Sequence, residues 1–348
     1  MKKHAIIIRS IKKKDLEDIA LCIRNGGIVV FPTETVYGLG ANVFDSRAIE
    51  KIFRAKGRPS DNPLIVHVYN LAQLELVAKD VPEVAIKLFK KFSPGPLTIV
   101  LPKKDTVPSI VTAGLPTIAV RIPSHPVARA ILKEVKLPIA APSANISGRP
   151  SPTTFEMAKR EMENRVDFII DGGDCKFGLE STVVQIKESE VIILRPGAIT
   201  KEMLQSVLPH PHYIVKQFDE VKVSKPLSPG QKHAHYKPFA EVYIVDKIDI
   251  EKIKKLFGNK KIGILTIDSK SLVPENVILK SFKNLSDYAK NLYRAFVEMD
   301  SSGVEVILVQ SVPEKGIGRA IMNRLLKAAE NKYLNDVQEN IPLYILKQ

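Results

Sequence analysis

The chain has little cysteine, no tryptophan and no long hydrophobic run, and each absence excludes a class of protein. Cys22 and Cys175 are its only cysteines, too few for a disulfide framework or a zinc ligand set, so we expect a reducing compartment. No run of about eighteen apolar residues and no charged-then-apolar leader with a cleavage site occurs, so nothing supports membrane insertion or export. We therefore expect a soluble, cytoplasmic protein with no membrane partner.

The remaining composition is that of a globular chain with an excess of positive charge. Of its 348 residues, 45% are hydrophobic, which is enough for two domains with separate cores. A formal net charge of +14 and a pI near 9.5 favour anionic partners such as nucleotides or RNA. The lysines are scattered, however, as on a solvated surface. A non-catalytic module for tRNA or double-stranded RNA is the alternative class, although 6% aromatic residues disfavour base stacking.

The expected elements divide the chain into three parts. Residues 1–206 alternate strand-like apolar runs with helical patterns, which predicts an α/β or α+β domain. Residues 207–240 are rich in proline, histidine and lysine and lack periodicity, which predicts a linker loop. Residues 241–348 alternate buried strands with helices and predict a small Rossmann-like parallel α/β domain.

The segment 56–59, Lys-Gly-Arg-Pro, predicts an anion site. In an extended backbone, Lys56 and Arg58 project from one face and pair an ammonium with a guanidinium fork, which suits a polyphosphate. The same segment is also typical of a helix end, because residues 46–55 can form an amphipathic helix with basic side chains in its last turn. Both interpretations remain open from these residues alone.

Two expected strands carry polar side chains that a small molecule could contact. Thr117 and Arg121 share one face of the strand 117–122, where a hydroxyl and a guanidinium flank a gap that suits a carboxylate. An edge arginine paired with a surface acid explains the same pattern. His67 lies in the otherwise apolar strand 64–68, which is typical of a core histidine.

Other polar segments lie at strand ends. Thr35 follows the strand 27–31, in a segment that fits either a small-molecule lip or a plain turn. Residues 143–148 supply hydroxyls, an amide and backbone N–H groups after a strand, where α/β proteins commonly bind ligands, although turn chemistry also explains them. His233 and His235 do not predict a metal site, because no cysteine or acidic ligand completes the set nearby.

Five segments, taken in order, resemble the threonylcarbamoyl-AMP synthase family and its YrdC-like domain. They are residues 32–40, 56–64, 142–145, 180–182 and 195–197. The tail resembles the long, two-domain branch of that family, through residues 235–238 and 316–324. The resemblance covers nearly the whole chain. It implies a twisted mixed sheet around a deep positive cavity, then a linker loop over the active site and a small α/β domain.

The resemblance implies a nucleotidyltransferase that joins L-threonine, bicarbonate or CO2, and ATP into threonylcarbamoyl-AMP, releasing pyrophosphate. The product serves threonylcarbamoyladenosine modification of tRNA next to the anticodon. Transient contact with the threonylcarbamoyltransferase machinery is implied, and direct tRNA binding is left open. Magnesium is implied through the ATP phosphates, with no direct protein ligand. A carbamoylation factor for metalloenzyme maturation uses the same domain, but it carries cysteine-rich segments that this chain lacks.

The resemblance also implies roles for individual residues. Lys56 and Arg58 are the implied catalytic residues and would hold the phosphates. The other residues implied to surround ATP are Asn62, Thr117, Ser143, Asn145, Ser151, Arg195 and Tyr236. Arg121 would take the threonine carboxylate, and the residues implied to shape the amino-acid pocket with it are Thr35, His67, Ala141 and Ser181. Asn145 would support magnesium or phosphate oxygens, His67 is the candidate general base, and the loop of Tyr236 would close over the cavity.

Overall fold

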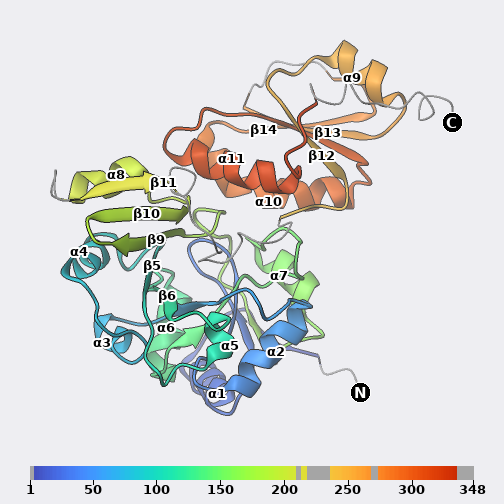
Figure 1. Cartoon of the computed structure of the whole chain (residues 1–348). Helices are drawn as coiled ribbons and strands as arrows, with labels where there is room; N and C mark the ends of the chain where they lie inside the picture. Colours follow the sequence, from blue (N-terminus) through green and yellow to red (C-terminus); the bar gives the residue numbers. More distant parts are fainter. Residues whose placement is uncertain (1–3, 209–212, 218–235, 268–272, 335–348) are drawn as a thin grey trace. The chain divides into compact units, whose positions relative to one another are not determined.

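The computed structural model describes residues 4–208, 213–217, 236–267 and 273–334, which form two compact units (Figure 1). The first unit contains the residues up to His233 except Gly148–Pro150, and the second contains Gly148–Pro150 and the residues from Ala234 onward. A three-residue segment from the middle of the sequence therefore belongs to the second unit. None of the described helices is both long and apolar enough to cross a membrane.

The first unit is built on a mixed sheet whose described strands follow the order β1-β8-β2-β3-β7-β4-β6-β5-β9-β10-β11. Their bounds are β1 Ile6–Ile8, β2 Val29–Phe31, β3 Gly38–Asn42, β4 Ile65–His67, β5 Leu97–Pro102, β6 Thr117–Arg121, β7 Ile139–Ala140, β8 Phe168–Ile170, β9 Thr182–Lys187, β10 Glu190–Arg195 and β11 Ile214–Gln217. Parallel pairs such as β4 with β6 lie beside antiparallel pairs such as β5 with β6. The mixed sheet confirms the expected fold class.

Helices cover both faces of this sheet. Their bounds are α1 Lys13–Arg24, α2 Ser46–Lys56, α3 Leu71–Leu74, α4 Glu83–Phe92, α5 Ser109–Thr112, α6 Pro126–Val135, α7 Phe155–Met162 and α8 Lys201–Val207. Successive residues of a strand point to opposite faces, and in β2 Val29 joins one hydrophobic cluster while Val30 joins another. The first cluster also contains Ile19 of α1 and Leu132 of α6, and the second contains Ile52 of α2. The sheet is thus buried on both sides.

Helix α2 decides between the two interpretations of segment 56–59. Asp45 caps the helix by accepting hydrogen bonds from the backbone N–H groups of Arg47 and Ala48. Lys56 is the last helical residue, and Gly57 ends the helix at φ 59°, a left-handed conformation that glycine adopts at little cost. The extended backbone expected for Lys56 and Arg58 is therefore wrong, and the helix-end interpretation is confirmed.

The predicted linker contains part of the large sheet. Strand β11 pairs in parallel with β10, with Glu190 opposite Ile214 and Ile193 opposite Gln217. The first unit therefore continues past the predicted boundary at residue 206. The rest of the predicted loop, residues 209–212 and 218–235, lies outside the described residues.

The second unit is a small parallel α/β fold, as the sequence predicts. Its strands, β12 Glu241–Val245, β13 Ile262–Thr266, β14 Val277–Ser281 and β15 Val306–Gln310, are all parallel and follow the order β12-β15-β13-β14. Figure 1 shows α9 (Ile250–Phe257) on one side of this sheet and α10 (Leu285–Ser301) with α11 (Ile317–Ala328) on the other. The segment 316–320 opens helix α11, with Gly316 at its N-cap.

Strand β3 offers a test of the packing at the middle of the large sheet. A Cβ atom on Gly40 would lie 2.6 Å from Phe31 Cε1 and 2.8 Å from Ile139 Cγ2, whereas one on Gly38 would approach no atom closer than 3.5 Å. We expect Gly40→Ala to lower the free energy of unfolding by about 1–3 kcal/mol through overpacking. Gly38→Ala, the control in the same strand, should change it by less than about 1 kcal/mol. Urea unfolding followed by circular dichroism measures both, and equal effects would contradict this account.

Candidate active site

Three strands of the large sheet place His67, Arg121 and Thr98 in one row. His67 at the end of β4 is opposite Arg121 at the end of β6, and Arg121 is opposite Thr98 near the start of β5. Side chains of residues in register project from the same face of a sheet, about 5 Å apart from strand to strand. The structure therefore brings two predicted amino-acid-binding residues together, although β4 and β6 are far apart in the sequence.

The guanidinium of Arg121 is buried and held on several sides. Its Nη2 lies 2.8 Å from Glu34 Oε1, and its Nη1 donates to Thr35 Oγ1 at 2.8 Å. Its Nε donates to the Gly95 carbonyl at 3.4 Å. Two of the five N–H groups of the guanidinium donate hydrogen bonds, while Nη2 makes an ion pair with Glu34 and has no hydrogen-bond partner among the described residues. A carboxylate can bridge the two terminal nitrogens of a guanidinium.

Two titratable groups beside Arg121 have shifted pKa values. Burial raises the pKa of Glu34, but the charge of Arg121 and its hydrogen bond outweigh burial and lower this pKa overall. Burial, followed by the charge of Arg121, lowers the pKa of His67 to about 3. Neither ring nitrogen of His67 has a hydrogen-bond partner among the described residues. His67 is therefore a neutral, buried ring with unused donor and acceptor capacity, and it is a weak base.

Ser181 connects this row to Arg195. Thr98 Oγ1 and Ser181 Oγ are 2.8 Å apart. Arg195 donates from Nε to the Ser181 carbonyl and from Nη2 to Ser181 Oγ, both at 3.1 Å. Ser151 Oγ donates to Glu180 Oε1 at 2.6 Å, in the residue next to Ser181. Two predicted site residues, Ser181 and Arg195, thus form one hydrogen-bonded group with Thr98, and Ser151 is bonded to the neighbouring Glu180.

Gly197 explains why the segments 180–182 and 195–197 lie against each other. A Cβ atom there would be 2.4 Å from the Thr182 backbone nitrogen and 2.7 Å from the Glu180 carbonyl oxygen. The backbones approach too closely for any side chain. This contact fixes Arg195 beside Ser181.

Lys56 forms a second group with Ser143 and Asn145. Its side chain is 2% exposed, and Nζ donates to the carbonyl oxygens of Ser143 and Asn145, both at 2.6 Å. Asn145 Oδ1 lies 3.5 Å from the same Nζ and accepts a 2.6 Å hydrogen bond from Ser143 Oγ. Burial, followed by the charge of Arg58, lowers the pKa of Lys56 well below its usual value. Lys56 therefore stabilises the loop that carries Ser143 and Asn145 through hydrogen bonds to its backbone.

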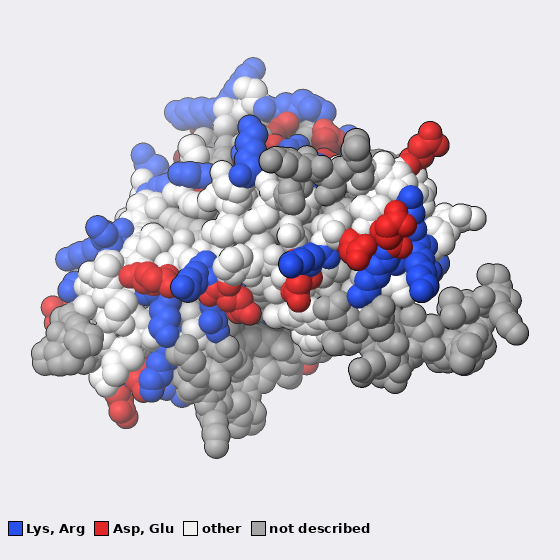
Figure 2. Space-filling view, turned by 90° about the horizontal axis from the view of Figure 1, so that it is seen from above, with Lys and Arg blue, Asp and Glu red and all other residues white. Residues whose placement is uncertain are grey.

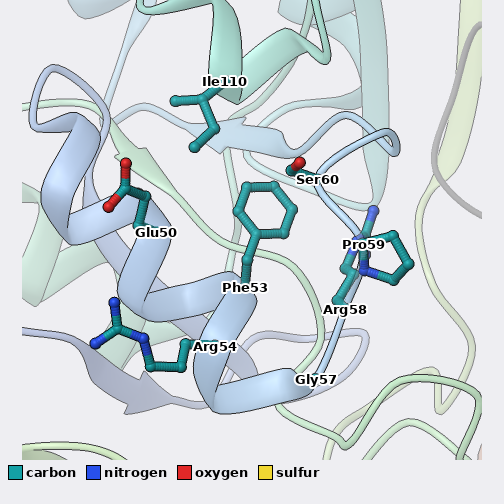
Figure 3. Close-up of a pocket in the computed structure, with 8 residues that line it drawn as sticks. All are labelled: Glu50, Phe53, Arg54, Gly57, Arg58, Pro59, Ser60 and Ile110. Atoms are coloured by element: carbon teal, nitrogen blue, oxygen red, sulfur yellow. The ribbon is translucent and has the colours of Figure 1, made fainter.

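Arg58 turns to a different loop. Its Nη2 donates to the carbonyl oxygens of Asn62 at 3.0 Å and Pro63 at 3.1 Å. Beside this turn is a pocket of about 590 Å³, shown in Figure 3. The pocket is lined by Glu50, Phe53, Arg54, Gly57, Arg58, Pro59, Ser60 and Ile110. Of the predicted site residues it contains Arg58 alone, so it is not the place where they converge.

Three other predicted residues lie apart from these groups or use their groups elsewhere. Thr117 is opposite Pro102 at the start of β6, about 13 Å along the strand from Arg121. The Ala141 backbone N–H donates to the Ile65 carbonyl at 2.9 Å, in a sheet-like contact beside β4. Tyr236 belongs to the second unit, where its ring stacks on Tyr293 with centroids 5.2 Å apart.

Sequence reasoning missed two residues of the site. Glu34 was not recognised as the partner of Arg121, because a single acid between two threonines is equally typical of a turn. Thr98 was missed although it carries the signal that identified His67, a lone polar side chain in an apolar strand. Its register and its hydrogen bond to Ser181 give it a place in the site.

The described residues offer magnesium no protein cage. No group of three or more His, Cys, Asp or Glu side chains there could hold a metal ion. The amide oxygen of Asn145, an oxygen ligand of the kind magnesium prefers, is already engaged by Ser143 and approached by Lys56.

Comparison with known proteins identifies the family. The family model described as telomere recombination, Sua5_yciO_yrdC, matches residues 22–197, and the model described as threonylcarbamoyl-AMP synthase, C-terminal domain, matches residues 199–330. A threonylcarbamoyl-AMP synthase from Pyrococcus abyssi is 45% identical over 88% of this chain and 92% of its own length. One from Bacillus subtilis is 44% identical over 90% and 93%, respectively.

A solved structure has the same fold over almost the whole chain. The crystal structure of P. abyssi Sua5 complexed with L-threonine matches with a TM-score of 0.86 and 42% identity, covering 95% of this chain and 99% of its own. With both family models matched in order along one chain, this protein belongs to the two-domain branch of the threonylcarbamoyl-AMP synthase family.

Proposed function

We propose that this protein is a nucleotidyltransferase that makes threonylcarbamoyl-AMP from L-threonine, bicarbonate or CO2, and ATP. The observation that carries the proposal is the convergence of Arg121, Thr35, His67 and Ser181 on one face of the sheet, with buried cations in the adjoining segments. A relative of the same fold was crystallised with L-threonine. The residues implied by the five sequence motifs and the contacts in the structure point to the same chemistry.

Arg121 fixes the amino acid. The N–H groups left on its two terminal nitrogens suit the threonine carboxylate, while the hydrogen bond to Thr35 and the ion pair with Glu34 hold the guanidinium in place. The neutral ring of His67 and the hydroxyl of Ser181 are available to polar groups of the substrate. Because His67 is a weak base, we assign it to binding and orientation rather than to proton abstraction.

The reaction needs positive charge more than a base. The threonine amine attacks CO2, a C–N bond forms, and a proton leaves to give a carbamate. A carbamate oxygen then attacks the α-phosphorus of ATP, and the bond to the β-phosphate oxygen breaks to release pyrophosphate. Since an anion attacks an anion, the described cations Arg58, Lys56 and Arg195 would lower the barrier electrostatically. Proximity of the bound substrates supplies much of the remainder.

Lys56 and Arg58 divide the work at the phosphates. Lys56 is committed to the carbonyls of Ser143 and Asn145, so it orders that loop and acts on phosphate through its charge. Arg58 is half-buried and held by the carbonyls of Asn62 and Pro63. Magnesium would bind the phosphates of ATP and neutralise part of their charge. Ser151 and Thr117 remain proposed nucleotide contacts, and the proposed closing role of Tyr236 depends on a loop outside the described residues.

The product would serve tRNA modification in the cytoplasm, through transient contact with a transferase that accepts the threonylcarbamoyl group. The alternative, a non-catalytic RNA module, requires a continuous basic surface. Figure 2 shows basic side chains in several separate places with acidic ones among them on the face in view. The near full-length similarity to threonylcarbamoyl-AMP synthases favours the enzyme over the RNA module.

The proposed function is tested by pyrophosphate release from ATP with magnesium, omitting threonine and bicarbonate one at a time. Release that requires both, together with an adenylate of threonylcarbamoyl-AMP mass, is the expected result. Release that requires neither, or salt-sensitive RNA binding without any release, would reject it.

Arg58→Ala should lower the rate of pyrophosphate release by about 10²–10³-fold, because it removes a cation that stabilises charge in the transition state. Arg54→Ala is the matched control: it removes an exposed cation from the last turn of α2, four residues before Arg58, and should leave the rate within about twofold. Steady-state kinetics at saturating ATP measures both. Equal rates in the two arginine variants would remove Arg58 from the phosphate site.

Lys56→Ala should also lower the free energy of unfolding by about 1–3 kcal/mol, since two carbonyls lose their donor.

His67 should make the protein sensitive to mild acid. Its pKa is lowered to about 3 in the folded state by burial, whereas an unfolded histidine titrates near 6.5. The unfolded state therefore binds the extra proton, and stability present above about pH 6.5 is lost as the pH falls toward 3, by about 1.4 kcal/mol per unit. Between pH 6.5 and 5 the wild type should lose about 2 kcal/mol more than His67→Gln. Urea unfolding measures the difference, with the exposed His4→Gln as control, and parallel curves for wild type and His67→Gln would contradict the shift.

A further inference from the structure

Arg121 and Glu34 form an ion pair that is buried on both sides. Arg121 is 4% exposed and Glu34 is 3% exposed. Glu34 Oε1 lies 2.8 Å from Arg121 Nη2, and Glu34 Oε2 accepts a 3.0 Å hydrogen bond from the Ser124 backbone N–H. Since Ser124 follows the end of β6, Glu34 supports Arg121 from the same strand end that carries it. The carboxylate is fixed by two partners and approaches the guanidinium from one side only.

Stability gives little reason for such a pair. Taking two charges out of water costs about as much as their attraction returns, so a buried ion pair adds little to stability over apolar residues of the same size. Removing one partner is a different matter, because it leaves an unbalanced charge in the interior. The pair therefore controls the charge of its surroundings more than it controls the free energy of folding.

The groups around the pair are mostly uncharged, so the net charge of Arg121 and Glu34 affects how a ligand binds. His67 is in register with Arg121 and is neutral, since burial and then Arg121 lower its pKa to about 3. Thr35 and Thr98 contribute hydroxyls. Arg195 approaches this end through Ser181, to which its Nε and Nη2 both donate. Glu34 thus cancels the one positive charge that lies in direct contact with Thr35.

A free amino acid is a zwitterion, with a carboxylate and an ammonium a few ångströms apart. A lone buried guanidinium would attract the carboxylate and repel the ammonium. With Glu34 beside it, the guanidinium keeps N–H groups on both terminal nitrogens for the carboxylate, while the local field on the ammonium is reduced. A balanced pair therefore suits a ligand of zero net charge, and an unbalanced one suits an anion.

We propose that Glu34 is a positioning and charge-balancing residue that makes the amino-acid end of the site select a zwitterion over an anion or a cation of the same size. This inference rests on the proposed function, because it takes L-threonine to be the ligand of Arg121. It adds that the amino-acid end of the site discriminates between ligands by their net charge as well as by their shape.

The test compares three ligands of nearly equal shape in calorimetric titrations of the full chain without ATP. L-threonine is the zwitterion, 2,3-dihydroxybutanoate of matching stereochemistry is the anion, and L-threoninol is the cation. In Glu34→Gln, which removes the charge but keeps the size of the side chain and one acceptor oxygen, the affinity ratio should move toward the anion by at least about tenfold. Glu83→Gln removes an exposed carboxylate from α4 and should leave all three affinities unchanged.

A second comparison does not depend on the folding of Glu34→Gln. Arg121→Gln leaves Glu34 as an unbalanced negative charge, and the double variant Arg121→Gln with Glu34→Gln is neutral. L-threoninol should bind about tenfold more tightly to the single Arg121→Gln variant than to the double variant. A role of Glu34 in structure alone would weaken all ligands together.

The outcomes separate this inference from the function on which it rests. If the wild type binds L-threonine but the ligand ratios do not move in either comparison, Glu34 does not set ligand charge and the inference fails. If the wild type binds none of the three ligands, the proposed function itself fails, and the inference with it. A shift toward the anion in Glu34→Gln and toward the cation in Arg121→Gln supports the inference.

Discussion

The site depends on cations that are buried before any substrate arrives. Lys56, Arg121 and Arg195 are each at most 5% exposed, and a buried charge is tolerated only where acceptors surround it. The acceptors come from loops: Ser143 and Asn145 for Lys56, Glu34 and Thr35 for Arg121, and Ser181 for Arg195. These contacts order both the loops and the cationic side chains. The site is therefore ordered before a substrate binds.

This arrangement separates two electrostatic tasks within one unit. At the amino-acid end, Glu34 offsets Arg121 and His67 is neutral, so the surroundings are close to balanced. Around Arg58 and Lys56, which we propose to act at the phosphates, burial and then the charge of Arg58 lower the pKa of Lys56. Their mutual repulsion is a cost that a polyphosphate would relieve on binding. A neutral end and a strained positive end suit a reaction that joins an amino acid to a nucleotide.

From the sequence, the identities of the site residues could be predicted better than their arrangement in space. The five motifs contain Ser143, Asn145, Ser181 and Arg195, the resemblance also implied Arg121 outside them, and each of these residues makes side-chain hydrogen bonds near the candidate site. Register is not visible in a sequence, which is why Thr98 was missed while its partner Arg121 was found, whereas Glu34 was missed because a single acid between two threonines is equally typical of a turn. For segment 56–59 the sequence left an extended backbone and a helix end open, and Gly57 in a left-handed conformation decides for the helix end. Strand β11 was missed because it lies in a segment whose prolines and histidines are typical of loops.

The row of His67, Arg121 and Thr98 has a thermodynamic consequence for the first unit. A ligand that contacts this row touches three strands, β4, β6 and β5, which the chain reaches at widely separated points. Its binding free energy is added to the free energy of unfolding of the first unit, which contains all three strands. These strands are joined to one another through the sheet, so a bound substrate opposes the separation of segments that are remote in the sequence.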